Sequence, residues 1–153
     1  MLEQPLKTQQ GHSLYEQDFY QWTQQMAAVL RNNNFDQLDI ENIAEEIESL
    51  GRSDRRELKS RLTVLLMHLL KWHYQPEQRS NSWRATIIEQ RMWILDLLSE
   101  SPSLVSYLKG EVDWCYNNAK SLAAAETGLT LTTFPQDCPY LLTEVLEKTP
   151  LAD

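Results

Sequence analysis

The amino-acid sequence predicts an all-α protein, a single-domain bundle of four to five amphipathic helices with a short C-terminal helix. Its 153 residues correspond to one domain of ordinary size. Only four glycines and six prolines interrupt a leucine-rich chain that is 42% hydrophobic, which favours helices over strands. Apolar residues also recur every three or four positions in several stretches. We expect the bundle to span residues 13–148, between a flexible segment at 1–12 and a tail at 149–153.

The first predicted helix begins at Ser13, which forms a capping box with Glu16. It ends near Arg31, because the asparagines at 32–34 favour a turn. Its apolar seam consists of Tyr15, Phe19, Trp22, Met26 and Val29.

Asp39 caps the next helical stretch, which Pro76 ends. Its seam consists of Ile40, Ile43, Ile47, Leu50, Leu58, Leu62, Leu65, Leu69 and Trp72. Two alternatives remain open: one long helix over 40–74 that kinks near Gly51, or two helices in a tight turn. A glycine inside a helix costs about 1 kcal/mol, which is too little to decide between them.

Three further helices are predicted in the rest of the chain. The first is capped by Ser80–Ser82 and has its seam at Trp83, Ile87, Ile94 and Leu98. The second starts at Ser101-Pro102 and stops at Gly128, with its seam at Val105, Leu108, Val112, Cys115, Ala119 and Leu122. A threonine-rich loop over 129–136 then leads to a short helix at about 139–147.

The sequence predicts a cytoplasmic protein without a metal or a cofactor. Two cysteines cannot make a disulfide framework, and neither lies in a CxxC pair. His68 and His73 are five residues apart, so they do not share a helix face as a metal-binding i, i+4 pair would. The longest apolar run, Val64–Leu70, is far short of the ~20 residues that span a bilayer. The chain contains no Walker, GxGxxG or GxSxG motif.

Charge is unevenly distributed along a chain whose formal net charge is −8. Residues 52–91 contain nine basic and four acidic residues, whereas the rest contains five basic and eighteen acidic ones. A stripe of alternating three- and four-residue spacing consists of Glu41, Glu45, Glu48, Arg52, Arg55 and Lys59. This stripe is interpreted either as a solvated face with weak ion pairs or as a docking strip for an oppositely charged partner.

Arg91 lies between Ile87, Ile88, Ile94 and Leu95 at helical spacing, so its charge needs a partner. One hypothesis is a structural bridge to Glu46. The other is an anion pocket in which Arg79, Arg84 and Arg91 face a phosphate or a carboxylate.

A second candidate site surrounds the turn at Pro76. It consists of His68, Lys71, Trp72, His73, Tyr74, Arg79, Trp83 and Arg84. Cations and aromatic rings together can clamp a nucleotide or a single-stranded base. Because Trp72 and Trp83 fall on helix seams, packing is the favoured interpretation of these two rings.

The leading hypothesis is a binding module that recognises another protein, without catalysis of its own and without a membrane partner; a homo-oligomer is compatible with it. One alternative is a nucleotide or nucleic-acid ligand at the basic segment 52–91, bound by Lys71, Arg79, Arg84 and Arg91 with Trp72 or Trp83. Another is a hydrolase or metal-dependent enzyme that uses His68 with Glu45, Glu46 or Glu48.

The chain also resembles a bacterial family known as domain of unknown function 29. The resemblance rests on Leu14–Trp22, Ile43–Gly51, His68–Trp72 with Gln75-Pro76, Ser82–Arg91, Phe134-Pro135 and Cys138-Pro139. It covers about residues 14–147 and implies an all-helical bundle, common in cyanobacteria and proteobacteria. It implies no settled activity, cofactor or catalytic residue.

Overall fold

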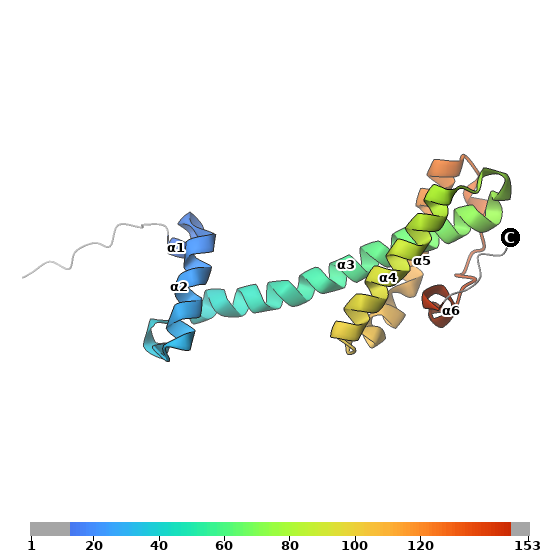
Figure 1. Cartoon of the computed structure of the whole chain (residues 1–153). Helices are drawn as coiled ribbons and strands as arrows, with labels where there is room; N and C mark the ends of the chain where they lie inside the picture. Colours follow the sequence, from blue (N-terminus) through green and yellow to red (C-terminus); the bar gives the residue numbers. More distant parts are fainter. Residues whose placement is uncertain (1–12, 148–153) are drawn as a thin grey trace, which may run out of the picture. The chain divides into compact units, whose positions relative to one another are not determined.

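The computed structural model describes residues 13–147, and the described part of the chain is helical, with short turns and no strand. The predicted all-α class is therefore confirmed, whereas the predictions for 1–12 and 149–153 lie outside the described residues. The helices in chain order are α1 Leu14–Gln17, α2 Phe19–Arg31, α3 Ile40–Tyr74, α4 Asn81–Glu100, α5 Leu104–Thr127 and α6 Leu142–Leu146 (Figure 1). Short 3₁₀ turns occupy Phe35–Gln37, Pro76–Gln78 and Leu131–Thr133.

The chain divides into two compact units, Met1–Leu50 and Gly51–Asp153, and α3 contributes residues to both. Each unit has a hydrophobic core of its own.

The N-terminal unit contains two helices where the sequence predicted one. Asp18 has a φ of −148°, which ends α1, and its carboxylate accepts a hydrogen bond of 3.0 Å from the Gln21 amide at the start of α2. The expected capping box at Ser13 is wrong in detail, because the Ser13 side chain makes no capping hydrogen bond. An aspartate is a strong N-cap, and Asp18 starts a new helix five residues after the predicted cap at Ser13. The predicted end at Arg31 is confirmed.

The core of the N-terminal unit is small and consists of Trp22, Met26 and Val29, with Leu14, Tyr15, Leu38 and Ile43 packed against it. Two polar contacts tie the start of α3 and the residue before it to this core. The Trp22 indole donates a hydrogen bond of 3.1 Å to the Asp39 carboxylate, and the Tyr15 hydroxyl donates one to Glu46.

Helix α3 is continuous from Ile40 to Tyr74, which decides between the two alternatives for this stretch. It passes through Gly51, where an added Cβ would meet no atom within 4 Å. The helix ends just before Pro76, as predicted, and Pro76 begins the 3₁₀ turn that leads into α4.

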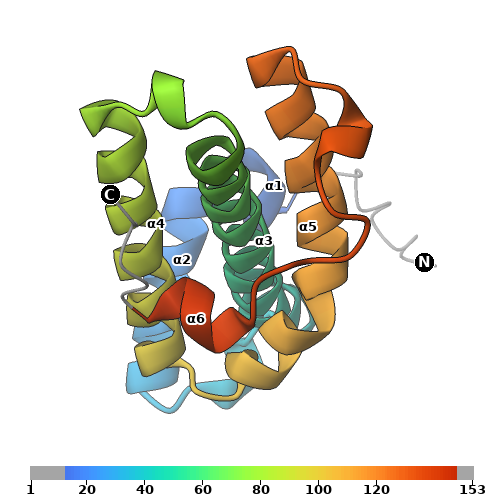
Figure 2. The ribbon, with the colours of Figure 1, turned by 90° about the vertical axis from the view of Figure 1, so that its right-hand side faces the viewer.

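In the C-terminal unit, α3 lies between α4 and α5, and α6 packs against α4 (Figure 2). The core draws on all four of these helices and on the loop before α6. Its largest fully buried side chains are Leu58, Leu62, Leu65, Leu66, Leu70, Ile87, Ile94, Leu108, Cys115, Tyr116 and Val145. Most of the predicted seams of α4 and α5 therefore face the core, but Leu122 at the end of the α5 seam is 46% exposed.

Helix ends in the C-terminal unit follow the predicted signals except at the starts of α5 and α6, and α6 begins at Leu142, three residues after the predicted start. Ser80 caps α4 through the Trp83 amide, and Gly128 ends α5 with a φ of 73°. Pro102, however, is not the first residue of α5, which starts at Leu104. Ser101 instead closes α4 and accepts a hydrogen bond from the Leu104 amide, so Pro102 lies in the turn between the two helices.

Candidate functional site: a basic and aromatic cluster at the α3–α4 turn

The turn between α3 and α4 brings together two arginines and one tryptophan of the predicted cluster. The guanidinium carbon of Arg79 lies 4.9 Å from the centroid of the Trp72 ring, and that of Arg84 lies 5.6 Å from it. Arg79 Nε also donates a hydrogen bond of 2.9 Å to the Trp72 carbonyl oxygen. Both cations are thus held at the same indole.

These three side chains line a cavity of about 400 Å³ together with Ser80 and Asn81 at the start of α4. The five lining residues include no carboxylate. Trp72 is only 3% exposed, so its ring anchors the arginines and offers little surface on which a base could stack. The cavity therefore has a cationic and polar lining.

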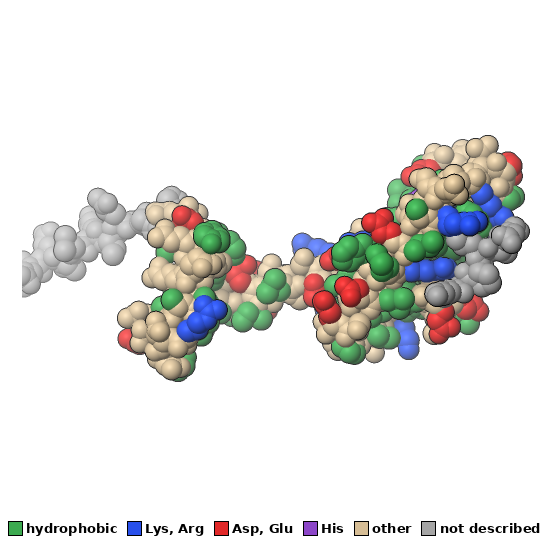
Figure 3. Space-filling view, viewed as in Figure 1, with side chains coloured by type: hydrophobic (Ala, Val, Ile, Leu, Met, Phe, Trp, Pro, Cys, Tyr) green, Lys and Arg blue, Asp and Glu red, His purple; other side chains and the backbone are tan. Residues whose placement is uncertain are grey.

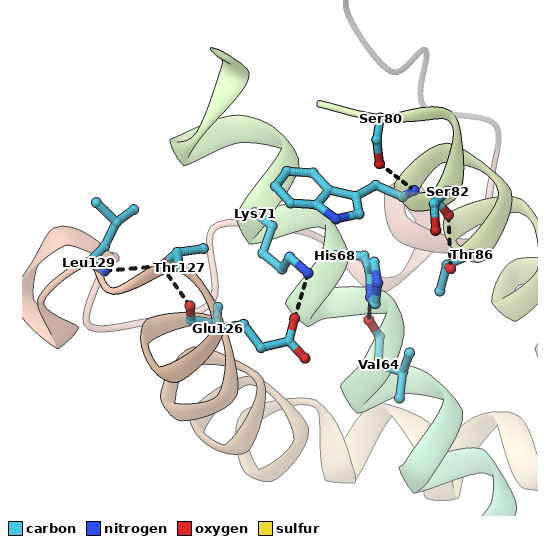
Figure 4. Close-up of polar contacts among 11 residues, drawn as sticks. Val64, His68, Lys71, Ser80, Ser82, Thr86, Glu126, Thr127 and Leu129 are labelled. Carbon is cyan, nitrogen blue, oxygen red and sulfur yellow. Dashed lines mark hydrogen bonds and ion pairs between the residues drawn. The ribbon is translucent and has the colours of Figure 1, made fainter. Parts of the chain in front are cut away.

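Lys71, His68 and Glu126 form a second polar group, on α3 and α5 (Figure 4). The Lys71 ammonium is buried, forms an ion pair of 2.5 Å with the Glu126 carboxylate and lies 4.5 Å from the centroid of the Trp83 ring. His68 Nδ1 lies 2.9 Å from the Val64 carbonyl oxygen, and burial is the largest cause that lowers the pKa of His68. Lys71 thus connects α3 to α4 and α5, whereas the contact of His68 lies within α3.

Arg91 is buried, as predicted, but the partner that the structure gives it was not predicted. Arg91 Nε donates a hydrogen bond of 2.7 Å to the backbone carbonyl of Val145 in α6. Burial lowers the pKa of its guanidinium. Glu46, the expected partner, instead accepts a hydrogen bond from the Tyr15 hydroxyl in the N-terminal unit. Because a backbone carbonyl leaves no signal in the sequence, pattern analysis could not find this partner.

The remaining predicted residues belong to the charged stripe of α3. Two of its three basic members contact α5: the Arg55 guanidinium lies 4.9 Å from the Tyr107 centroid, and Lys59 pairs with Glu111 at 3.0 Å. Glu45 and Glu48 are exposed in the N-terminal unit. Within residues 13–147, no group of three or more histidines, cysteines or acidic residues is placed to hold a metal ion.

Helix α4 exposes an apolar face that sequence analysis missed. Ile88 is 56% exposed, Met92 59% and Leu95 47%, and they follow one another at helical spacing. Trp93 is 41% exposed and lines a hollow of about 460 Å³, together with Met92, Leu95, Asp96 and Ser99. We refer to Ile88, Met92, Trp93 and Leu95 as the α4 face. The sequence pattern placed Ile88 and Leu95 in the same apolar seam as Arg91. In the structure, α4 has apolar residues on two sides, and only one of these sides faces the core.

Acidic residues border the α4 face. Glu89, Asp96 and Glu100 are exposed on the same helix, and Figure 3 shows hydrophobic and acidic side chains together on the surface over α4. The helix thus presents apolar side chains beside negative charge. No helix of the described residues is long and apolar enough to cross a membrane.

No curated protein and no solved structure matches the chain significantly. The model of the family described as "Domain of unknown function DUF29" matches residues 14–150, nearly the whole chain. The protein therefore belongs to the DUF29 family.

Proposed function

We propose that the protein is a binding module whose α4 face docks an amphipathic, basic helix of another protein. The observation that carries this proposal is the exposure of four large apolar side chains within two turns of one helix, three of which, Ile88, Met92 and Leu95, follow one another at a spacing of four and three residues. Burial of apolar surface contributes about 25 cal/mol per Å², so covering these side chains supplies a driving force for association. A helix that lies along another helix contacts it through residues at this spacing.

The acidic border determines the charge of the partner. Glu89, Asp96 and Glu100 are all exposed beside the α4 face. A partner helix with lysines or arginines along its apolar stripe complements these charges. A second copy of this chain is a poorer partner, because a symmetric contact through α4 would bring the acidic borders of both copies together.

The proposal is tested with two fluorescent helical peptides that share one leucine stripe. One peptide carries lysines beside the stripe and the other carries glutamates at the same positions. We expect the lysine peptide to bind the full chain saturably and the glutamate peptide not to bind. Replacing Met92 and Leu95 with serine removes two anchors, each worth about 1 kcal/mol or more, so we expect the Kd to rise by about tenfold or more.

The matched control is Leu131→Ser, which changes a leucine that is 50% exposed in another part of the same unit. This variant keeps the affinity of the unchanged protein if the α4 face is the docking site. Equal binding of both peptides, or equal loss in both variants, contradicts the proposal. So does a dimer in sedimentation experiments that the Met92 and Leu95 substitutions dissociate, because the α4 face would then pair two copies.

A further inference from the structure

We infer that a hollow between α3 and α5 binds a small organic acid that has an apolar body and one carboxylate. The hollow is lined by Arg56, Lys59 and Val64 of α3 and by Trp114 and Leu122 of α5, together with three polar side chains. We refer to it as the α3–α5 hollow. It lies within the C-terminal unit and shares no residue with the α4 face, so the inference is independent of the docking function proposed above.

The first argument is the apolar surface of the hollow. Trp114 is 50% exposed and Leu122 is 46% exposed, and both border the hollow beside the partly buried Val64. Leu122 continues the core-facing seam of α5, yet it lines this hollow instead of the core. The volume of about 430 Å³ lies within the range of about 300–1,000 Å³ that is typical of small-molecule sites. An apolar ligand body would remove these side chains from water, which favours binding.

The second argument is the charge of Arg56. Its neighbours three and four residues away on α3 are Arg52, Ser53, Lys59 and Ser60, so the helix offers it no carboxylate at the spacings that form ion pairs. Arg56 is exposed, and its side chain makes no hydrogen bond or ion pair with the described part of the chain. A planar guanidinium in this state can donate two parallel hydrogen bonds to a carboxylate.

The second cation of the hollow is already balanced. The Lys59 ammonium pairs with Glu111 at 3.0 Å and lies 3.7 Å from the centroid of the Trp114 ring. The lining itself contains no carboxylate. With Lys59 neutralised by Glu111, the hollow keeps the single positive charge of Arg56, which matches a ligand with a single negative charge.

The contacts of Lys59 also hold the Trp114 indole before a ligand arrives. A wall that is ordered in the free protein loses less side-chain entropy on binding. The hollow offers two exposed apolar side chains and one charge, whereas a docked peptide helix needs apolar anchors at several successive turns. A small acid therefore fits the hollow better than a helix of another protein does.

The test titrates the full chain with octanoate and, separately, with octylammonium, which has a tail of similar length and the opposite charge. NMR follows the indole N–H signals, and the signal that is missing in Trp114→Phe identifies Trp114. We expect octanoate to shift this signal saturably and octylammonium to leave it unchanged. Hexanoate is two methylenes shorter, so it should bind about tenfold more weakly, because each buried methylene contributes about threefold to fourfold in affinity.

Two variants separate the contributions of charge and of apolar contact. Arg56→Gln removes the charge at an exposed position, so we expect the Kd for octanoate to rise by about fivefold or more. Leu122→Ser removes an apolar contact and should raise the Kd by a similar factor. The matched control is Arg84→Gln, which changes an exposed arginine of α4 outside the hollow and should leave the Kd unchanged.

An unchanged Kd in Arg56→Gln overturns the inference, and so does an equal rise in Arg84→Gln. Equal shifts of the Trp114 signal by octanoate and octylammonium overturn it as well, because the hollow would then accept any apolar chain. Binding of the glutamate peptide that Arg56→Gln weakens, without binding of octanoate, would assign the hollow to an acidic helix instead. The Trp93 indole signal reports on the α4 face, so a failure of this inference is distinguished from a failure of the docking proposal.

Discussion

The Arg91 guanidinium joins α4 to α6 through the Val145 carbonyl, at a distance of 2.7 Å. Arg91→Met keeps much of the side-chain volume but leaves this carbonyl without its donor. We expect the free energy of unfolding to fall by about 1–3 kcal/mol, the cost of an unsatisfied buried polar group. Urea unfolding measures the change. Arg84→Met, on an exposed site of the same helix, should change it by less than about 0.5 kcal/mol. Equal effects would show that the Val145 contact contributes nothing to stability.

His68 gives the protein a predictable response to acid. Burial, and secondarily the nearby Lys71 ammonium, lower the pKa of His68 below its usual value of 6.5. The unfolded state therefore binds more protons than the folded state as the pH falls below about 6.5, and the folded state loses stability there. In His68→Asn, the amide can still donate to the Val64 carbonyl but does not titrate. We expect the urea midpoint of this variant to depend less steeply on pH between about 6.5 and 5. An unchanged slope would show that protonation of His68 does not cause the loss of stability in acid.

At the scale of the helices, glycines at two positions have opposite roles. Gly51 lies inside α3 with no positive φ, and an added Cβ there meets nothing within 4 Å. Gly51→Ala should therefore stabilise the protein by about 0.5–1 kcal/mol. Gly128 ends α5 with a φ of 73°, so Gly128→Ala should destabilise it by about 1 kcal/mol. Thermal unfolding followed by circular dichroism compares the two variants. A change of the melting temperature in the same direction in both variants would contradict a helix α3 that continues through Gly51.

The helices also show what local signals can and cannot predict. The stop signals at Arg31 and Gly128 and the cap at Ser80 were predicted correctly because each depends on backbone groups a few residues away. The start of α5 was predicted two residues early, because Ser101 caps the end of α4 instead. At Asp18, two competing N-caps lie close together, and the sequence pattern alone does not rank Ser13 below Asp18. The sequence thus predicts which helices form better than it predicts the residues at which they begin and end.

At the scale of the whole molecule, the two units should respond separately to core mutations. Trp22 is 5% exposed and belongs to a buried cluster of only three residues. Trp22→Ala should cost about 3–5 kcal/mol, which is enough to unfold the N-terminal unit. We expect faster amide hydrogen exchange in α2 with unchanged exchange in α4 and α5. Phe35→Ala, at a site that is 58% exposed in the same unit, is the control. Equal acceleration in α4 and α5 would show that the units unfold together.

The candidate sites were predictable only in part. Composition and spacing placed Trp72, Arg79 and Arg84 near one turn, and the structure brings them to one cavity. The α4 face was missed because the spacing of apolar residues along a helix does not show which of them pack against a neighbouring helix. Ile88 and Leu95 have the same pattern as core residues, and only the packing of α3 and α6 on one side of α4 leaves them exposed.

Oxidation of Met92 tests the docking role of α4 most directly. Met92 is 59% exposed at the centre of the α4 face, whereas Met67 is 7% exposed in the core and serves as the internal reference. Mass spectrometry measures how fast hydrogen peroxide converts each methionine to its sulfoxide. We expect a saturating amount of the lysine peptide to slow the oxidation of Met92 while the glutamate peptide leaves it unchanged. Unchanged oxidation of Met92 in the presence of a bound lysine peptide would show that the peptide docks elsewhere.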